Sequence, residues 1–316
     1  MTDPRSEELA AVEAIARHCS ETPPMPGGPL GLRVKTSVPL RAIVPARVAV
    51  ALAERRAARS WEREPQERER ALAAMRTLVG DTPRAAELEQ LARAHAIESR
   101  VKETMFWRPW RTASIEEGSA ARLRAALGSG RGVLVSACHQ GSLSTQFSVL
   151  HAVGASVWVA TGRWFFEPPT PDFWGRRIAR WWHGVRKRDE RYVPTEGSFA
   201  SLRTLLAHGR TVGIFFDMPG SRTTRFLGKQ VPLGSGSARL AKETEALVVP
   251  IRARREGDRI WVDVHEPLDA REHPDHERLH EALAAVHERW LLERPAGVED
   301  PNREGSWGAG AVKQAA

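Results

Sequence analysis

The stretch GVLVSAC, residues 132–138, is a short run of apolar and small residues. A run of this length with β-branched valines is typical of a strand that is buried on both faces. It is followed at once by His139 and by the segment QGSLS, residues 140–144. The sequence therefore predicts a buried strand that ends at His139 and leads into a helix over residues 142–153.

Four further apolar runs predict strands, at residues 155–161, 211–217, 246–253 and 259–266. Patterns with helical spacing separate most of them, at residues 142–153, 172–182, 196–208 and 235–245. A last helix is expected over 275–293. Strands that alternate with helices are typical of an α/β layer. We therefore predict an α/β fold, with a mostly parallel central sheet flanked by helices and preceded by a helical N-terminal region.

Composition divides the chain into four parts. Residues 1–36 hold a Pro/Gly-rich linker and are expected to form a flexible segment. Residues 37–127 carry apolar residues at helical spacing and predict helices packed on the core. Residues 128–294 hold the predicted strands and form the α/β core. Residues 295–316 are rich in glycine and polar residues, and we expect a loose C-terminal tail.

Composition and charge narrow the class of protein. With 316 residues, of which 41% are hydrophobic, the chain can build a large core. Its two cysteines, Cys19 and Cys138, argue against a disulfide scaffold or a cysteine-rich zinc site and suit a reducing compartment. A net charge of +8 favours anionic partners, whether nucleic acid, acidic lipid headgroups or phosphate-bearing carriers. The eleven tryptophans suit a membrane interface, but also an ordinary core.

The sequence carries no signal of a membrane span. The N-terminus lacks the apolar stretch of a signal peptide. No run of 18 or more apolar residues exists, so no transmembrane helix is predicted. The nearest approach is Val38–Leu52, which Arg41, Pro45 and Arg47 interrupt. This segment is interpreted as an interfacial or docking helix, and an ordinary core helix fits its pattern equally well.

His139 is the first candidate for a catalytic residue. A histidine at the C-terminal end of a buried strand lies where open α/β sheets place their sites. Imidazole is the natural general base near neutral pH, and it could take a proton from a hydroxyl or amine that attacks a thioester. Taken alone, the position also fits a structural histidine whose nitrogens bond the backbone.

Three further patterns follow His139 in order. The first is LAHG (206–209), then TVGIFF (211–216), Asp217 and FLGK (226–229). The second is ARLA (238–241) followed by ALVVP (246–250), and the third is the helix end HERW (287–290).

In this order and spacing, residues 131–290 resemble the lipid A lauroyl and myristoyl acyltransferases and the related phosphatidylinositol mannoside acyltransferases of the lysophospholipid acyltransferase superfamily. The hallmark of these enzymes is H-x4-D/E after a strand much like GVLVSACH, and His139 falls on its histidine. The resemblance implies transfer of a fatty acyl group with His139 as general base. It implies no metal or organic cofactor, and acyl-CoA or acyl carrier protein as donor substrate.

The chain departs from this motif at its acidic position, where Ser144 stands. In the family the carboxylate orients the imidazole and raises its basicity. A serine hydroxyl could accept the Nδ1 proton and fix the tautomer, but it cannot stabilise an imidazolium through charge. Asp217 is the candidate replacement acid. Asp217 can equally well be interpreted as a residue that ends a strand and caps the following turn.

Basic and aromatic residues alternate over residues 163–191. Under the resemblance they would hold a phosphate of the acceptor or the carrier beside an apolar acyl slot. The candidate substrate-binding residues are Arg163, Arg176, Arg177, Arg180 and, from the FLGK pattern, Gly228. The same mixture can bind nucleic acid, or form the solvated face of an amphipathic helix.

A competing motif is His276-Glu277-Arg278-Leu279-His280, a literal H-E-x-x-H that could place two zinc-binding histidines on one helix face. The surrounding segment is rich in His, Glu and Arg, which makes a chance match easy, and the motif stands at the very start of its helix. We therefore keep the zinc metalloprotease as a distant alternative and predict no metal site.

Together these observations predict an acyltransferase that moves a fatty acyl group to a polar (glyco)lipid-type acceptor. We expect it to be peripheral on the inner, cytoplasmic face of the cell membrane. Its expected partners are the acyl donor, the lipid acceptor and an anionic membrane surface, and not nucleic acid. The alternative from another class is a non-catalytic lipid-binding protein on the same fold, which Ser144 directly supports.

Overall fold

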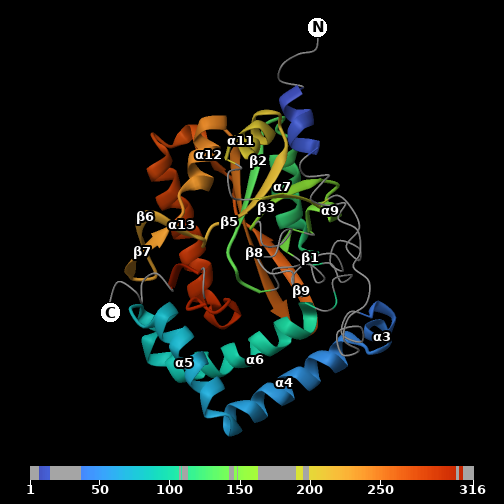
Figure 1. The fold of residues 1–316 in the computed structure, drawn as a ribbon, viewed down its shortest axis with the longest axis vertical. Helices are drawn as coiled ribbons and strands as arrows, with labels where there is room; N and C mark the ends of the chain where they lie inside the picture. Colours follow the sequence, from blue (N-terminus) through green and yellow to red (C-terminus); the bar gives the residue numbers. More distant parts are fainter. Residues whose placement is uncertain are drawn as a thin grey trace, which may run out of the picture.

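The computed structural model describes the chain over residues 7–14, 37–106, 108, 113–141, 146–147, 149–162, 190–194, 199–303 and 306–308. In this part of the chain, helices cover both faces of a central sheet, and further helices lie across one end of it (Figure 1).

The central sheet is mixed and mostly parallel. Its strand order is β1-β9-β8-β2-β5-β3-β4, and β10 also pairs with β8. The strands are β1 (Ser114–Ile115), β2 (Val133–Ala137), β3 (Val157–Thr161), β4 (Glu190–Pro194), β5 (Thr211–Phe215), β8 (Leu247–Glu256), β9 (Arg259–Val264) and β10 (Leu268–Asp269). β2 runs parallel to both β5 and β8, whereas β9 and β10 are antiparallel to β8. The predicted fold class is confirmed, and every predicted strand is present.

The sheet separates two hydrophobic clusters. Leu134 belongs to one cluster, and its neighbours Val133 and Val135 belong to the other, because side chains alternate along a strand. Helices on both faces cover these clusters. They are α11 (Phe199–Ala207), α12 (Gly236–Thr244) and α13 (His276–Glu293) on the first face, and α7 (Glu117–Leu127) and α9 (Val149–Ala152) on the second.

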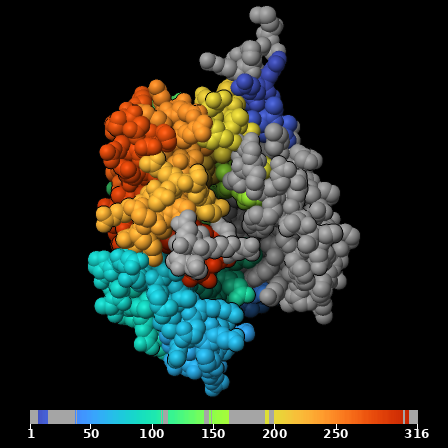
Figure 2. All heavy atoms as spheres, turned by 60° about the vertical axis from the view of Figure 1, so that its left-hand side comes forward, coloured from blue at the N-terminus to red at the C-terminus, as the bar shows by residue number. Residues whose placement is uncertain are grey.

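The helices of residues 38–106 lie in the lower part of the molecule, beneath the α/β body (Figure 1), and Figure 2 shows the same part at the bottom. They are α3 (Val38–Ile43), α4 (Ala46–Arg63), α5 (Pro65–Val79), η1 (Pro83–Glu87) and α6 (Leu88–Phe106). The single helix expected over Val38–Leu52 is divided between α3 and α4. Val44 is extended, with ψ of 118°, because the residue before a proline is disfavoured in a helix and Pro45 has no N–H to bond. None of the helices in the described ranges combines the length and apolar character that a membrane span requires.

A hairpin that the sequence did not predict connects β5 to α12. Its strands are β6 (Pro219–Phe226) and β7 (Lys229–Leu233), and the turn residues Leu227 and Gly228 have φ of 56° and 78°. Two positive φ values give a turn that matches the twist of a hairpin. A Cβ at Gly228 would lie 2.1 Å from the backbone oxygen of Asp81, so glycine is required. The geometry of the turn therefore explains why residue 228 is a glycine, without any role in substrate binding. The assignment of Gly228 to substrate binding stays a prediction.

The C-terminal segment is packed rather than loose where the structure describes it. Pro295, Val298 and Trp307 are buried. The Trp307 ring meets the Phe226 ring edge-on, with centroids 6.0 Å apart. The expectation of a loose tail therefore fails for residues 295–303 and 306–308, because isolated apolar residues of a polar stretch occupy core positions.

Candidate active site

His139 and Asp217 lie side by side at the edge of the sheet where β2 and β5 end. The two strands are parallel neighbours in register, with Ala137 beside Phe215, so the residues two positions beyond each strand come together. Asp217 Oδ1 lies 2.7 Å from His139 Nδ1, and Asp217 Oδ2 accepts a hydrogen bond of 2.9 Å from the His139 backbone N–H. One carboxylate therefore holds both the ring and the backbone of the histidine.

This contact shifts the pKa of both groups. Burial lowers the pKa of His139, but the Asp217 carboxylate raises it more through its charge and hydrogen bond, so the pKa lies above 6.5. Burial raises the pKa of Asp217, whereas the charge and hydrogen bonds of His139 lower it, so the pKa lies below 3.8. Each group therefore favours the charged form of the other.

The ring of His139 presents its second nitrogen as a base. Because Nδ1 faces a carboxylate, Nδ1 carries the proton in the neutral ring and Nε2 is the basic atom. The ring stacks on Phe215, with centroids 4.1 Å apart and an angle of 26°. The side chain of His139 is 18% exposed, whereas that of Asp217 is only 4% exposed. Asp217 is thus enclosed, while the His139 side chain is partly exposed.

A layer of buried rings lies behind the pair. Phe216 stacks on His287 of α13, with centroids 5.0 Å apart. His287 Nε2 lies 3.0 Å from Ser136 Oγ on β2. Burial lowers the pKa of His287 to about 4, so this ring is neutral at physiological pH. The sequence does not mark His287 as a neighbour of the site, because helical spacing alone does not show which strand end a buried histidine faces.

Gln140 and Gly141, which follow β2 closely, make contacts with distant parts of the chain. The Gln140 side chain donates hydrogen bonds to the backbone oxygens of Trp290 and Arg294, at 3.3 and 3.0 Å. Gly141 has φ of 70°, and a Cβ there would lie 2.6 Å from the backbone oxygen of Ala253. A glycine at this position therefore lets the loop pass close to β8.

Most other predicted site residues fall outside the part of the chain that the structure describes. These residues are Ser144, Arg163, Arg176, Arg177 and Arg180, and the helix predicted over 172–182 falls there too. The structure thus brings Asp217 to His139 and leaves the phosphate-binding assignment as a prediction.

The H-E-x-x-H motif makes ordinary structural contacts. His280 is buried with Nε2 2.9 Å from Thr224 Oγ1, and burial lowers its pKa to about 4. Glu277 is exposed and forms an ion pair of 2.6 Å with Arg222. In the described ranges, no three His, Cys, Asp or Glu side chains gather as metal ligands.

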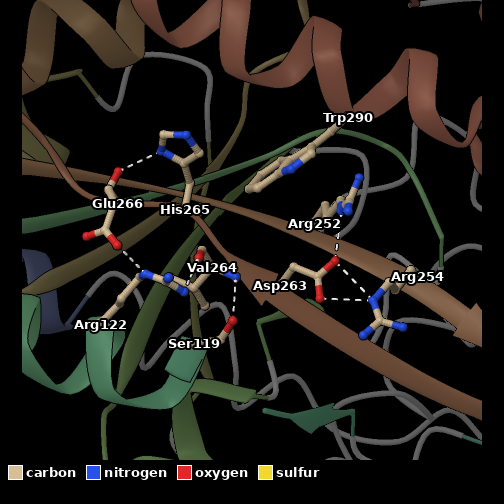
Figure 3. A pocket seen from close by; sticks show the side chains of 9 residues that line it. All are labelled: Ser119, Arg122, Arg252, Arg254, Asp263, Val264, His265, Glu266 and Trp290. Atoms are coloured by element: carbon tan, nitrogen blue, oxygen red, sulfur yellow. Dashed lines mark hydrogen bonds and ion pairs between the residues drawn. The ribbon is translucent and has the colours of Figure 1, made fainter. Parts of the chain in front are cut away.

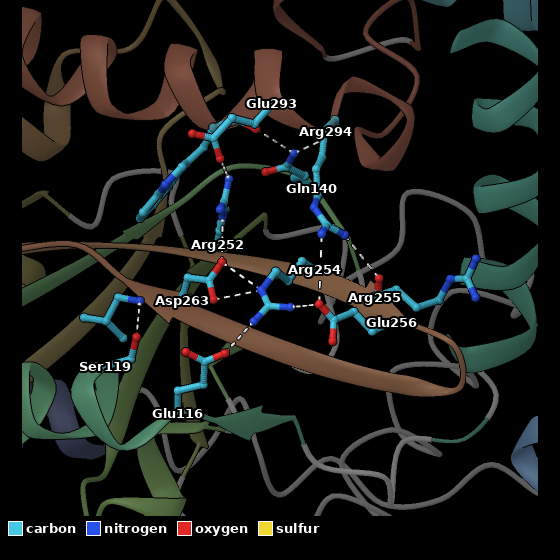
Figure 4. Close-up of polar contacts among 12 residues, drawn as sticks. Glu116, Ser119, Gln140, Arg252, Arg254, Arg255, Glu256, Asp263, Glu293 and Arg294 are labelled. Atoms are coloured by element: carbon cyan, nitrogen blue, oxygen red, sulfur yellow. Dashed lines mark hydrogen bonds and ion pairs between the residues drawn. The ribbon is translucent and has the colours of Figure 1, made fainter. Parts of the chain in front are cut away.

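A pocket of about 460 Å³ opens between α7, β9 and α13 (Figure 3). Its arginines already have carboxylate partners. Arg122 pairs with Glu266. Arg252 and Arg254 share Asp263 at 2.8 and 2.9 Å (Figure 4). Because these charges are neutralised within the protein, we assign no phosphate to this pocket. We interpret the network as a set of ion pairs that holds β8 and β9 together.

Residues 42–297 match the family described as bacterial lipid A biosynthesis acyltransferase. The chain belongs to this family. Among solved structures it is similar to the 1-acyl-sn-glycerophosphate (LPA) acyltransferase PlsC from Thermotoga maritima. The sequence identity is 16%, the match covers 78% of this chain and 96% of that chain, and the TM-score is 0.37. No curated protein matches the chain.

Membership of the lipid A acyltransferase family confirms the resemblance drawn from residues 131–290 and makes the chain an acyltransferase of lipid biosynthesis. The match begins near the end of α3, so α4, α5 and α6 are included in it. It ends at the last residue of η4 (Pro295–Gly297), and the residues from Val298 onward lie beyond it.

Proposed function

We propose that this acyltransferase moves a fatty acyl group from acyl-CoA or acyl carrier protein to a hydroxyl or amine of a polar, glycolipid-type acceptor. The observation that carries this proposal is the contact between His139 Nδ1 and Asp217 Oδ1 at 2.7 Å. A carboxylate in this position fixes the tautomer of the imidazole and leaves Nε2 as a general base. Asp217 thereby takes the role of the acid that the chain lacks at Ser144.

The reaction needs one proton transfer in each direction. His139 Nε2 takes the proton of the acceptor hydroxyl or amine as its oxygen or nitrogen attacks the thioester carbonyl carbon. The tetrahedral intermediate then collapses, the carbon–sulfur bond breaks, and the imidazolium returns the proton to the leaving thiolate. Asp217 stabilises the imidazolium between these steps because its carboxylate is ionised and buried beside it.

The proposed place of action is the cytoplasmic face of a membrane, and the surface of α3 and α4 supports it. Five large apolar side chains are exposed there: Leu40, Ile43, Val44, Val48 and Leu52. Exposed arginines flank them on α4: Arg47, Arg55, Arg56 and Arg59. Such a combination of apolar and basic side chains on adjacent helices suits shallow insertion into an anionic bilayer. We call this surface the α3–α4 patch.

Lipid profiles of cells test the proposal. Cells that express the wild type, His139→Ala or Asp217→Asn at equal levels are compared by mass spectrometry with cells lacking the protein. We expect one lipid class to gain an acyl chain with the wild type only, and this lipid identifies the acceptor. If the wild type and both variants gave the same profile, His139 would lose its proposed role, and the non-catalytic alternative would be favoured.

A further inference from the structure

The C-terminal segment Gly297–Glu299 forms hydrogen bonds with the loop that carries His139. The Glu299 backbone N–H donates to the His139 oxygen at 2.7 Å, and the Gly141 N–H donates to the Gly297 oxygen at 2.8 Å. Between them, Gln140 and Val298 form an antiparallel bridge. The segment therefore pairs with His139–Gly141 like a short strand. Its last two residues lie beyond the family match.

Helix α6 holds this segment from the other side. Lys102 Nζ donates to the backbone oxygens of Gly297 and Val298 at 3.3 and 3.0 Å. About two turns earlier in α6, His95 Nδ1 lies 3.2 Å from the Ala296 oxygen. The Gly297 oxygen thus accepts from both Lys102 and Gly141. A single carbonyl group links the ammonium group on α6 to the loop of the catalytic histidine.

Lys102 is half-buried on α6. Placing an ammonium group away from water is costly unless hydrogen bonds compensate. Burial lowers the pKa of Lys102 to about 8, so the group is still mostly protonated at neutral pH and donates to both carbonyls. A protonated amine gives stronger hydrogen bonds than a neutral donor, which suits a segment that must stay fixed.

We infer that Lys102 and the segment Gly297–Glu299 position His139 for its contact with Asp217. Lys102 is then a positioning residue that acts through the segment, and residues beyond the family match belong to the active site. This inference rests on the proposed role of His139. Its physical basis is that the backbone of residue 139 is fixed on one side by the Asp217 carboxylate and on the other by the Glu299 N–H.

The first test measures the pKa of His139 in the full-length protein by NMR with isotope-labelled histidine. The signal of His139 is identified by its loss in His139→Ala. The charged groups that face His139 are Asp217, Glu299 and Arg303. Removing a cation in Lys102→Met would by charge alone leave the pKa of His139 unchanged or raise it. Positioning predicts the opposite, a lower pKa, because the imidazole moves away from Asp217.

The control for Lys102→Met is Arg93→Met. Arg93 lies on the same helix, is exposed and pairs with Glu62. We expect this variant to keep the wild-type pKa of His139. Thermal unfolding shows whether each variant is folded. A folded Lys102→Met protein whose His139 pKa equals or exceeds the wild-type value would overturn the inference.

The second test removes the backbone donor of the segment. Glu299→Pro and Glu299→Ala both lose the carboxylate, but only the proline variant loses the N–H that bonds His139. We expect the pKa of His139 to be lower in Glu299→Pro than in Glu299→Ala. Equal values in two folded variants would contradict a positioning role and assign any shift to the lost charge.

Activity gives a separate readout with lauroyl-CoA as the probe donor. Displacing a catalytic group by about 1 Å can lower the rate about 10²-fold, so we expect kcat to fall by about that factor in Lys102→Met, with KM for lauroyl-CoA little changed. If neither the wild type nor any variant consumes lauroyl-CoA, then lauroyl-CoA is not a donor for this protein. The NMR comparison still decides the inference in that case.

Discussion

Asp217 receives two hydrogen bonds from one residue, His139, which donates from ring Nδ1 at 2.7 Å and from its backbone N–H at 2.9 Å. The second bond ties the carboxylate to the main chain, so Asp217 is oriented before the ring is protonated. A preorganised carboxylate of this kind stabilises an imidazolium without further rearrangement.

Exchanging Asp217 for asparagine separates its role from that of Ser144. We expect Asp217→Asn to lower kcat about 10²- to 10⁴-fold, because the neutral amide neither stabilises the imidazolium nor enforces the productive tautomer. We expect Ser144→Ala to lower kcat only slightly, since Asp217 already occupies Nδ1. Turnover of lauroyl-CoA by purified, folded variants measures both. A severe loss in Ser144→Ala together with an active Asp217→Asn would reverse the assignment.

The pH dependence of kcat/KM reports the pKa of the free His139. A general base must be neutral, so kcat/KM rises with pH through the pKa of the imidazole. Because Asp217 raises that pKa, we expect the rise of kcat/KM with pH to be centred above pH 6.5 in the wild type. In Asp217→Asn the residual kcat/KM should rise at lower pH than in the wild type. If the rise occurred at the same pH in this variant, a group other than His139 would be titrating.

The contribution of the His139–Asp217 pair to the stability of the protein depends on pH. The raised pKa of His139 contributes stability below 6.5 that is lost as the pH rises through the folded-state pKa. The lowered pKa of Asp217 contributes stability above 3.8 that is lost as the pH falls through its folded-state pKa. The difference in unfolding temperature between wild type and Asp217→Asn should therefore be largest between pH 3.8 and 6.5. Thermal unfolding across this range, in buffers of equal ionic strength, measures it.

The α3–α4 patch should govern membrane binding without affecting stability. Ile43 is 75% exposed and Leu52 is 57% exposed, so Ile43→Glu and Leu52→Glu remove no core contact. Losing one inserted side chain of this size costs about 1.4 kcal/mol, which weakens binding about tenfold. Co-sedimentation with vesicles containing phosphatidylglycerol measures this effect. Ala285→Glu, at an exposed position of α13, is the control and should bind like the wild type.

Asp263 should matter for stability rather than catalysis. It bonds Arg252 and Arg254, whose side chains are only 15% and 12% exposed. Asp263→Asn leaves two enclosed guanidinium groups without their shared carboxylate, and we expect a loss of about 2 kcal/mol in the free energy of unfolding. Chemical denaturation measures this loss. Glu62→Gln, which disturbs an exposed pair with Arg93, should leave the midpoint unchanged. Unchanged stability in Asp263→Asn would show that these ion pairs do not stabilise the contact between β8 and β9.

The strand ends could be predicted from the sequence, but their pairing could not. Apolar runs located β2 and β5, which placed His139 and Asp217 at strand ends. The strand β3 lies between β2 and β5 in sequence, yet β5 is the neighbour of β2 in the sheet. Strand order depends on how the helices pack, so the sequence could offer Asp217 only as a candidate.

The C-terminal contacts show a different limit. Val298 and Trp307 stand alone among glycine and polar residues, so no periodic pattern marks them as core. Their burial depends on surfaces formed by distant parts of the chain, including Phe226 for Trp307. The hairpin turn was missed for a related reason. Leu227 adopts a positive φ that leucine rarely takes, and only its fit within the fold sustains this conformation.

The pairing of Gly297–Glu299 with the His139 loop also determines when the enzyme becomes complete during its synthesis. His139 and Asp217 leave the ribosome well before residue 299, which must emerge before its N–H can bond the His139 oxygen. A nascent chain that has exposed α3, α4, His139 and Asp217 still lacks this last constraint. Under the inferred positioning role, a growing chain therefore reaches full activity only after Gly297–Glu299 has left the ribosome and paired with the His139 loop.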